Sequence, residues 1–327
     1  MSKIFWLKNR SDYVETHTIV SIFSSQDPWI ILSDMEKSIK AKIEAIGKPL
    51  KEWNIQINFG IKTGCNDAFI IDSVKRDDIL NNCKSAEERQ KTAEIIRPIL
   101  RGRDIKKYEY DWSNLWLIWV PWHFPYHLDT MIKGASEEAE KAFRNQYNAI
   151  YDHLYKYKEQ LLARNKAETG IRYEWYALQR WGANYWDLFS KPKIVWGEIS
   201  DRSKFCIDDT GSYYPEATTF MLSGDNLYLL LAFLNCSVSE YFFSTIGTTT
   251  GVGTIRWKKY KILELVVPNK LTSSQVSEIE NLCYKVALLK KTNPSEAIEV
   301  ERQLNHLIYN IYSLTEDEIN YIEQAVS

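Results

Sequence analysis

The feature that most constrains the fold is a continuous apolar run, Leu115-Trp-Leu-Ile-Trp-Val120, which ends at Pro121. A strand that is apolar at every position, rather than at every second one, is typical of a sheet covered on both faces. We therefore expect this segment to be a central strand with further structure packed above and below it.

Other segments predict the elements around that strand. Apolar residues recur every three or four positions, as on one face of a helix, in residues 34–46, 136–163 and 227–242. We expect one helix in each of these ranges. Strands are predicted by residues 193–199 and 262–267, and a strand, a turn containing glycine and a second strand by residues 59–72.

The end of the chain is predicted to be purely helical. Thr272-x-x-Gln275 and Thr315-x-x-Glu318 are capping boxes, and Asn293-Pro294 supplies a cap followed by a proline at the first helical position. The whole pattern predicts an α+β fold, a mixed-sheet domain with long helices and a C-terminal helical segment. We expect three zones: a partly helical N-terminal connector (1–57), the mixed domain (58–268) and a helical spacer or docking segment (269–327).

Charge and cysteine content narrow the function further. The chain of 327 residues carries a net charge of −2, but residues 264–327 carry −5 and the rest +3, so one lobe is suited to a polyanion. The five cysteines are odd in number and form no Cys-x-x-Cys pair, which argues against a disulfide framework or a thiolate zinc site. With no apolar run of about 20 residues and no signal-peptide pattern, we expect a cytoplasmic protein without a membrane partner.

Motifs for catalysis are incomplete. Asp27-Pro28-Trp29 lacks the second proline of an amino-methyltransferase corner, and Asp104-Ile-Lys106 fits only the loosest form of a metal-dependent nuclease motif. Gly247-Thr-Thr-Thr-Gly-Val-Gly253 lacks the Gly-Lys-Ser/Thr of a P-loop. Pro125 prevents the helix that would bring His123 and His127 to one face, so structural histidines are the better interpretation. We therefore expect no metal or cofactor site in this chain.

Two basic runs point instead to binding. Arg97-Pro-Ile-Leu-Arg101-Gly-Arg103-Asp-Ile-Lys106-Lys107 surrounds Gly102 with cations, and Thr254-Ile-Arg256-Trp-Lys258-Lys259-Tyr-Lys261 mixes cations with aromatic rings. The guanidinium group of arginine can donate two parallel hydrogen bonds to a guanine edge or a phosphate. Cations interleaved with aromatic residues are typical of nucleic-acid grooves. Taken singly, each run is also compatible with an ordinary solvated surface.

A family resemblance covers these same residues. Gly60-Ile-Lys-Thr-Gly-Cys-Asn-Asp-Ala-Phe-Ile-Ile-Asp72 and Ile96-Arg-Pro-Ile-Leu-Arg-Gly-Arg-Asp-Ile105 resemble the first two motifs of the TaqI-like C-terminal specificity domain. Lys193-Ile-Val-Trp-Gly-Glu-Ile199, Lys261-Ile-Leu-Glu-Leu-Val-Val-Pro268 and the stretch from Leu307 to Ile319 also fit. Such domains recognise the target of restriction–modification proteins, mainly Type IIG enzymes, and are similar to the recognition halves of Type I specificity subunits.

The resemblance implies sequence-specific binding of double-stranded DNA on behalf of an adenine-N6 methyltransferase and, in some systems, a nuclease. Both catalytic parts would be partners of this chain, and S-adenosylmethionine and Mg²⁺ would belong to them. The chain would be a fragment of a longer enzyme or a separate subunit. Its terminal helices would dock on the methyltransferase or another recognition unit, or simply cap the sheet.

The candidate DNA-binding residues come from three regions. The first region is the glycine-bearing turn, the second is the two basic runs, and the third is a polar and aromatic loop at 169–180. The candidates are Lys62, Thr63, Asn66, Arg97, Arg101, Arg103, Lys106, Lys107, Arg172, Gln179, Arg180, Arg256 and Lys258. The alternative for the turn is a purely structural hairpin, and for Trp175 and Tyr176 in the loop it is core packing.

Two alternative functions stay open at this point. A stand-alone, divergent DNA methyltransferase would bind the methyl donor by itself. A module for protein or carbohydrate binding would use exposed aromatic residues, and its affinity would not depend on salt.

Overall fold

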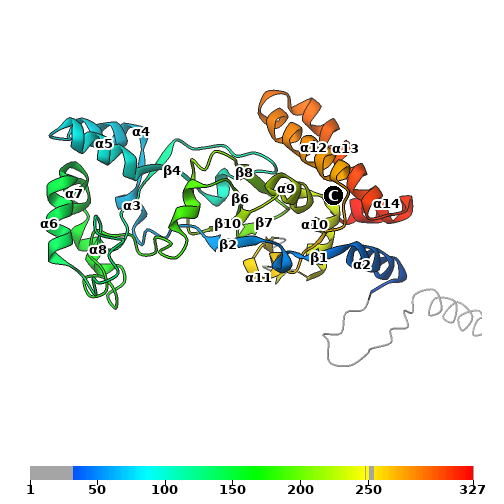
Figure 1. The fold of residues 1–327 in the computed structure, drawn as a ribbon, viewed down its shortest axis with the longest axis horizontal. Helices are drawn as coiled ribbons and strands as arrows, with labels where there is room; N and C mark the ends of the chain where they lie inside the picture. Colours follow the sequence, from blue (N-terminus) through cyan, green and yellow to red (C-terminus); the bar gives the residue numbers. More distant parts are fainter. Residues whose placement is uncertain (1–31, 247, 250–253, 327) are drawn as a thin grey trace, which may run out of the picture.

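The computed structural model describes residues 32–246, 248–249 and 254–326 of an elongated molecule. A helical lobe forms one end, small sheets form the middle, and the C-terminal helices lie beside the first described helix at the other end (Figure 1). The Asp27-Pro28-Trp29 motif and most of the Gly247–Gly253 run lie outside the described residues.

The first described helix is α2 (Asp34–Ile46), which confirms the prediction for residues 34–46. Ser33 and Glu36 form a reciprocal capping box, and Ile39 and Ile43 are buried. The chain then forms β1 (Gly47–Pro49), which pairs antiparallel with the distant β13 (Val266–Pro268), followed by the short η1 (Leu50–Glu52).

A four-stranded antiparallel sheet forms the centre of the molecule. Its order is β2 (Ile55–Phe59), β10 (Thr219–Gly224), β6 (Lys193–Gly197) and β8 (Phe205–Asp208). Successive side chains point to opposite faces of a strand. Leu222 therefore packs into one hydrophobic core, while its neighbour Met221 packs into the other.

A second sheet contains the apolar run of the sequence. Its order is β3 (Ile70–Asp72), β5 (Leu115–Ile118), β4 (Ile96–Leu100) and β9 (Tyr214–Pro215). β4 pairs antiparallel with β5 and parallel with β9, so this sheet is mixed, as predicted. Leu117 and Ile118 are both fully buried, which confirms that both faces of the predicted central strand are covered.

A small third sheet joins β11 (Thr248–Thr249), β12 (Ile255–Arg256) and β7 (Ile199–Ser200). After it, α11 (Lys259–Ile262) begins at the second basic run. The expected strand over residues 262–267 is therefore shorter than predicted, because only Val266–Pro268 are extended.

The helical lobe packs around the mixed sheet. It contains α3 (Asn66–Phe69), α4 (Ser73–Asn81), α5 (Ala86–Ile95), α6 (Glu137–Gln146), α7 (Asn148–Tyr155) and α8 (Lys158–Ala163). The single long helix predicted for residues 136–163 was wrong, since Tyr147 has φ −135° and ψ 49°, which ends α6. The buried Glu88 carboxylate accepts the Ala149 N–H at 2.8 Å and so supplies a hydrogen bond to the start of α7.

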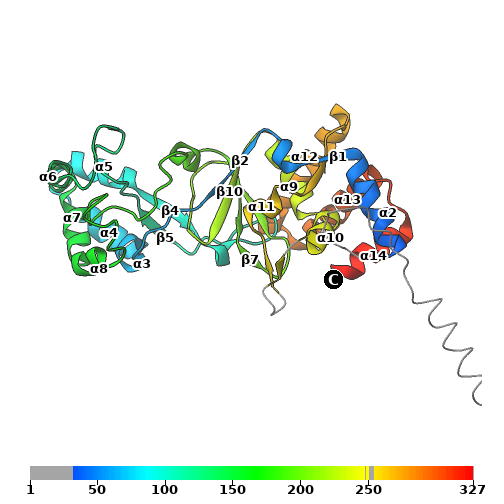
Figure 2. The same cartoon turned by 90° about the horizontal axis from the view of Figure 1, so that it is seen from below.

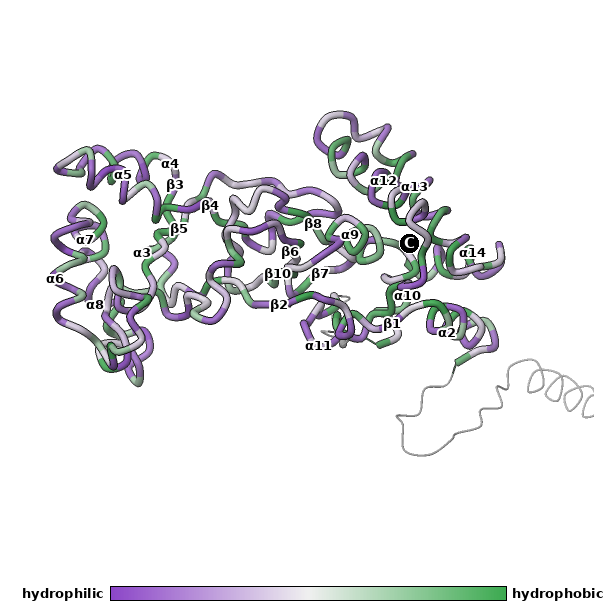
Figure 3. The backbone as a smooth tube through the Cα atoms, in the orientation of Figure 1, coloured by the Kyte–Doolittle hydropathy of each residue, from purple (hydrophilic) through white to green (hydrophobic). Residues whose placement is uncertain are grey.

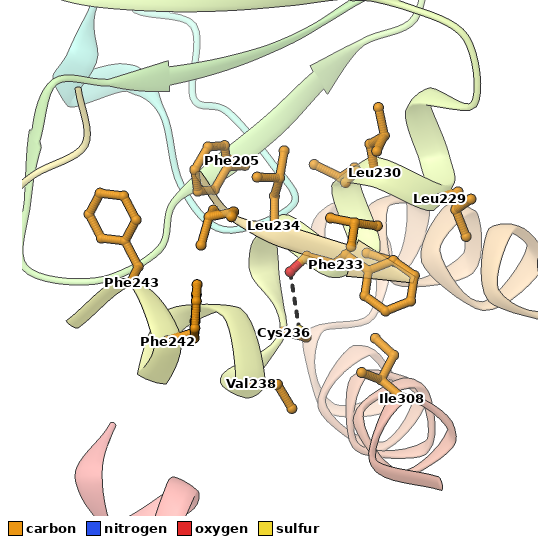
Figure 4. Packing of buried hydrophobic residues seen from close by; sticks show 14 of the residues in the cluster. Phe205, Leu229, Leu230, Phe233, Leu234, Cys236, Val238, Phe242, Phe243 and Ile308 are labelled. Atoms are coloured by element: carbon orange, nitrogen blue, oxygen red, sulfur yellow. Dashed lines mark hydrogen bonds between the residues drawn. The ribbon is translucent and has the colours of Figure 1, made fainter. Parts of the chain in front are cut away.

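The helix predicted over residues 227–242 is also divided. α9 (Leu227–Asn235) and α10 (Ser237–Ile246) meet at 67°. At the bend, the Cys236 thiol donates to the Phe233 carbonyl oxygen at 3.1 Å (Figure 4).

Among the described residues, no single helix is long and apolar enough to cross a membrane. The bent pair of α9 and α10 together has the length and composition to do so, but most of it is buried in the protein core.

The three predicted terminal helices are confirmed as α12 (Ser273–Thr292), α13 (Pro294–Ile311) and α14 (Glu316–Ala325). Both predicted capping boxes form, and Asn293 caps α13 ahead of Pro294. The apolar faces of these helices pack on α9 and α10. Figure 3 shows α9 and α10 among the hydrophobic segments, whereas α5 at the opposite end of the molecule is mostly hydrophilic.

The hydrophobic cores follow different borders from the three expected zones. One core joins α2, one face of the four-stranded sheet, α9, α10 and the terminal helices. The other joins the mixed sheet, the helical lobe and the opposite face of the same four-stranded sheet. The terminal helices thus share a core with residues of the middle zone, and the α+β fold is built around one common sheet.

Candidate nucleic-acid interface

An open groove of about 470 Å³ lies where the glycine-bearing turn meets the first basic run. Its floor is partly apolar, with Ile70 and Leu115 from the mixed sheet. The polar side of the groove combines arginine, amide, hydroxyl and carboxylate groups. These belong to Asn66, Asp67, Arg101, Arg103, Glu216 and Thr218.

Backbone packing holds the turn in place. Gly60 passes so close to the chain at 215–216 that a Cβ there would lie 2.0 Å from the Glu216 carbonyl oxygen, so only glycine fits. The predicted strand–turn–strand is present as β2 and β3, but the turn contains the short helix α3. Asn66 and Asp67 stand in its first turn, at the mouth of the groove.

Thr63 orients Asn66. The Thr63 side chain is buried, and its hydroxyl donates to Asn66 Oδ1 at 2.5 Å. Because Oδ1 accepts this hydrogen bond, the amide NH₂ group is the donor that Asn66 can offer to a ligand in the groove. Of the two predicted readers, Asn66 is therefore placed at the groove, whereas Thr63 acts beneath it.

Lys62 lies on the same turn and is paired with the polar loop. Its N–H and carbonyl exchange hydrogen bonds with those of Arg180, both at 2.9 Å. Both side chains are exposed, and the Arg180 guanidinium lies 5.0 Å from the centre of the half-exposed Phe59 ring. Gln179 is half-buried, and its N–H donates to the Thr63 carbonyl oxygen at 3.3 Å. Residues predicted from two distant segments thus meet.

The two central arginines of the first basic run differ sharply. Arg101 forms a two-pronged ion pair with the buried Asp104, with nitrogen–oxygen distances of 3.1 and 3.0 Å. Burial opposes the ionised form of Asp104, but hydrogen bonds from Arg101 and Ser113 outweigh it and lower the pKa of this carboxyl. Arg103 is exposed on η2 (Gly102–Asp104) and lines the groove, with no ion pair to any residue the structure describes.

The other cations of this run point elsewhere. Arg97 lies on β4, with its Nε buried and its guanidinium carbon 5.9 Å from the centre of the Tyr214 ring. Lys106 pairs with Asp111 at the surface. Lys107 reaches the terminal helices and pairs with Glu301 of α13 at 2.7 Å. These three predicted contacts are not among the residues that line the groove.

The second basic run lies next to the first. η2 packs against β6, where Gly102 lies beside Gly197, and the chain continues through Glu198 into β7, the partner of β12. Arg256 of β12 is partly exposed and lies 3.4 Å from Glu198, and Lys258 is half-buried near Tyr260. In Figure 2, α3 and β7 lie toward the same long side of the molecule. The structure thus brings Arg103 and Arg256 to neighbouring elements.

The loop at 169–180 divides between core and surface. Arg172 is exposed and pairs with Glu168 at 3.1 Å, while Trp175 and Tyr176 are buried in the core, which is the structural alternative for these rings. His123 Nδ1 lies 3.0 Å from the carboxylate of the buried Glu174, a contact that agrees with the structural interpretation of this histidine. The described part of the chain contains no group of three or more metal-ligating side chains.

Four groups at or beneath the groove were missed from the sequence. Asp67 directly follows the predicted Asn66 in the same turn, so its position in the motif could have identified it. Glu216 and Thr218 come to the groove from a segment whose backbone pairs with Ile61 and Leu100, both distant in sequence. Arg164 lies beneath the turn, and apart from the one to the Leu161 carbonyl oxygen its hydrogen bonds go to backbone oxygens of other segments, so no local pattern revealed it.

Comparison with known families identifies the chain. The model of the TaqI-like C-terminal specificity domain matches residues 97–267, which is just over half of the chain. The chain belongs to this family. The match contains Arg101, Arg103, Glu216 and Thr218 of the groove, whereas the turn with Asn66 and Asp67 lies before it.

Solved structures of restriction enzymes are similar to this chain, and the one in complex with DNA shares its fold. One is that of the Type IIL restriction-modification enzyme MmeI in complex with DNA, with a TM-score of 0.55 and 14% identity over 85% of this chain and 36% of that one. Another is that of the type IIG restriction endonuclease BpuSI, with a TM-score of 0.46 and 13% identity over 85% of this chain and 33% of that one. The chain therefore spans about a third of the length of either enzyme.

Proposed function

We propose that this specificity domain recognises a short sequence of double-stranded DNA for a restriction–modification system. The observation that carries the proposal is the groove, in which the exposed Arg103 and the oriented amide of Asn66 converge from two segments. Membership of a family of specificity domains supports it.

The groove offers groups for reading base edges. A guanidinium donates two parallel hydrogen bonds to guanine O6 and N7, and an amide NH₂ group can donate to a purine N7 or another acceptor in the major groove. Lys62, Arg180 and Arg256 are exposed or partly exposed beside this site and would contact phosphates, which set the register on the duplex without reading it.

Catalysis would be supplied by other parts of the system. Because the chain spans 36% of the Type IIL enzyme that shares its fold, we propose that an adenine-N6 methyltransferase, with or without a nuclease, acts as a linked domain or a separate subunit. S-adenosylmethionine and Mg²⁺ would be bound by those parts. The methyltransferase would flip the adenine that the specificity domain has brought within reach. This assembly would work in the cytoplasm.

Salt dependence of duplex binding tests the proposal. With about four to six phosphate contacts, the logarithm of the binding constant should fall with the logarithm of salt concentration with a slope of roughly −4 to −5. Replacing Lys62 and Arg180 together by alanine should make the slope shallower by about 2, because each phosphate contact contributes about 1. Lys285→Ala is the control, since Lys285 pairs with Glu296 on the terminal helices.

The competing functions predict other results. Binding of S-adenosylmethionine to this chain alone, measured by isothermal titration, would favour a stand-alone methyltransferase. Absence of duplex binding at low salt, both alone and with the catalytic part present, would refute a role in DNA recognition.

A further inference from the structure

Arg164 follows α8 and lies beneath the glycine-bearing turn, where it is partly buried. Nη1 donates to the Thr63 carbonyl oxygen at 2.6 Å, Nη2 to those of Trp175 at 2.8 Å and of Ala177, and Nε to that of Leu161 at 3.1 Å. No carboxylate among the described residues forms an ion pair with it. Desolvation lowers the pKa of Arg164 to about 10, so the guanidinium stays charged at neutral pH.

The first connection from Arg164 leads to the turn. The carbonyl that it binds belongs to Thr63, whose hydroxyl fixes the amide of Asn66 at the groove. Gly64 follows with φ +77°, and a Cβ at this position would lie 2.9 Å from Arg164 Cδ. The turn therefore packs closely against the aliphatic part of the Arg164 side chain.

The second connection leads to the polar loop. Trp175 and Ala177 precede Gln179 and Arg180 in the same segment, and both backbone carbonyls are held by Nη2. This segment in turn bonds to the backbone of Lys62 and Thr63. One side chain therefore holds both segments that carry exposed recognition candidates.

We propose that Arg164 is a positioning residue that couples the turn at 60–66 and the loop at 175–180 into a single recognition unit. This inference rests on the proposed function. Because Arg164 has no carboxylate partner among the described residues, its positive charge is stabilised by the dipoles of four carbonyl groups, which all point at the planar guanidinium. A lysine would keep the charge but has a single ammonium in place of three separate nitrogens, so it cannot bind all four oxygens in this geometry.

The test is Arg164→Lys, with base preference measured by selection from randomised duplexes. We expect the folded variant to lose discrimination by about tenfold or more at the base pair contacted by Asn66 of the turn, with the salt slope unchanged. Arg89→Lys is the matched control, because Arg89 donates to the Leu80 carbonyl oxygen at 2.5 Å in the helical lobe. This control should keep the wild-type preference.

A coupling measurement separates positioning from general support of the fold. In the wild type, the combined effect of Asn66→Ala and Gln179→Ala on the binding constant should differ from the product of the two single effects by at least about threefold. In the Arg164→Lys background, the combined effect should equal that product. A purely structural Arg164 would lower the melting temperature but leave the preference and the coupling of the folded protein intact, and this result would overturn the proposal.

Two further outcomes are decisive. Wild-type protein that binds duplexes without any base preference would refute the proposed function, whereas preference that survives in Arg164→Lys would refute only the coupling. If the variant does not fold, hydrogen exchange of the wild type decides instead. The amides of Ala68 and Ala177, each hydrogen-bonded within its own segment, should then open together, and independent opening would overturn the proposal.

Discussion

At the scale of residues, the two arginines on either side of Gly102 show how one sequence pattern can hold two different roles. Arg101 is neutralised by Asp104, and its side chain is 15% exposed. Arg103 is exposed at the groove and has no ion-pair partner in the described ranges of the chain. The first therefore shapes η2, and the second is free to contact a ligand.

Arg103→Ala should relax the preference for one base pair of the target. A two-pronged arginine contact contributes about 1–3 kcal/mol of discrimination, so the loss should be confined to one position and leave protein stability unchanged. Selection from randomised duplexes measures it, with Arg302→Ala on α13 as the control. Uniform weakening across all sequences would instead assign Arg103 to a phosphate.

Asp104→Ala should act on stability. It leaves the partly buried Arg101 without its partner, and breaking a buried ion pair in this way costs about 3–5 kcal/mol. We expect this loss in the free energy of unfolding by urea denaturation. Replacing Asp111, the exposed partner of Lys106, by alanine should change stability by less than about 1 kcal/mol. Equal effects of the two variants would contradict this distinction.

At the scale of elements, the contact between α2 and α14 depends on Glu318. This buried carboxylate accepts hydrogen bonds from Ser38 and Lys42 of α2, both at 2.6 Å, and from the Thr315 N–H at 2.8 Å. Burial alone would raise the pKa of Glu318, but these hydrogen bonds lower it to about 2. The first described helix is thereby tied to the last.

The free energy of unfolding should fall at low pH because the Glu318 carboxylate becomes protonated. The pKa of Glu318 is lower in the folded chain than its usual 4.5, so its contribution is complete above that pH and is lost as pH falls toward about 2. Glu318→Gln should lower the free energy of unfolding by about 1–3 kcal/mol at pH 7. The difference between wild type and variant, measured by urea denaturation, should shrink below pH 4.5. A constant difference would show that Glu318 is not ionised in the folded protein.

At the scale of the whole molecule, both cores use the four-stranded sheet as a wall. Trp196 and Leu222 of this sheet face the core that contains the terminal helices, whereas Val195 and Met221 face the core of the helical lobe. A perturbation of either face must therefore be felt by the strands that form the other.

Leu222→Ala should weaken both halves of the protein. Truncating a fully buried leucine costs about 2–5 kcal/mol, and the shared strands should pass that loss to the helical lobe. Hydrogen exchange should show reduced protection in β5 as well as in α9, although Leu222 belongs only to the core containing α9. Unchanged protection in β5 would mean that the halves unfold independently.

Local patterns were sufficient for much of the fold. The central strand at 115–118, the helix at 34–46 and the three capped terminal helices are confirmed, because periodic apolar residues and capping side chains act on their own segment. The two broken helices were missed, since Tyr147 and Cys236 carry no proline or glycine signal. At the first break, the start of α7 bonds to the distant Glu88, and at the second the Cys236 thiol bonds to the nearby Phe233 carbonyl oxygen.

By itself, the sequence determined the α+β class, the capped helices and the two regions from which the groove is built. Only the tertiary structure decided which cations remain available, since Asp104, Asp111 and Glu301 neutralise Arg101, Lys106 and Lys107, while Arg103 stays exposed. It also revealed Arg164, whose partners are carbonyl oxygens. Every residue has a carbonyl group, so only the folded backbone can select the four that converge on one guanidinium.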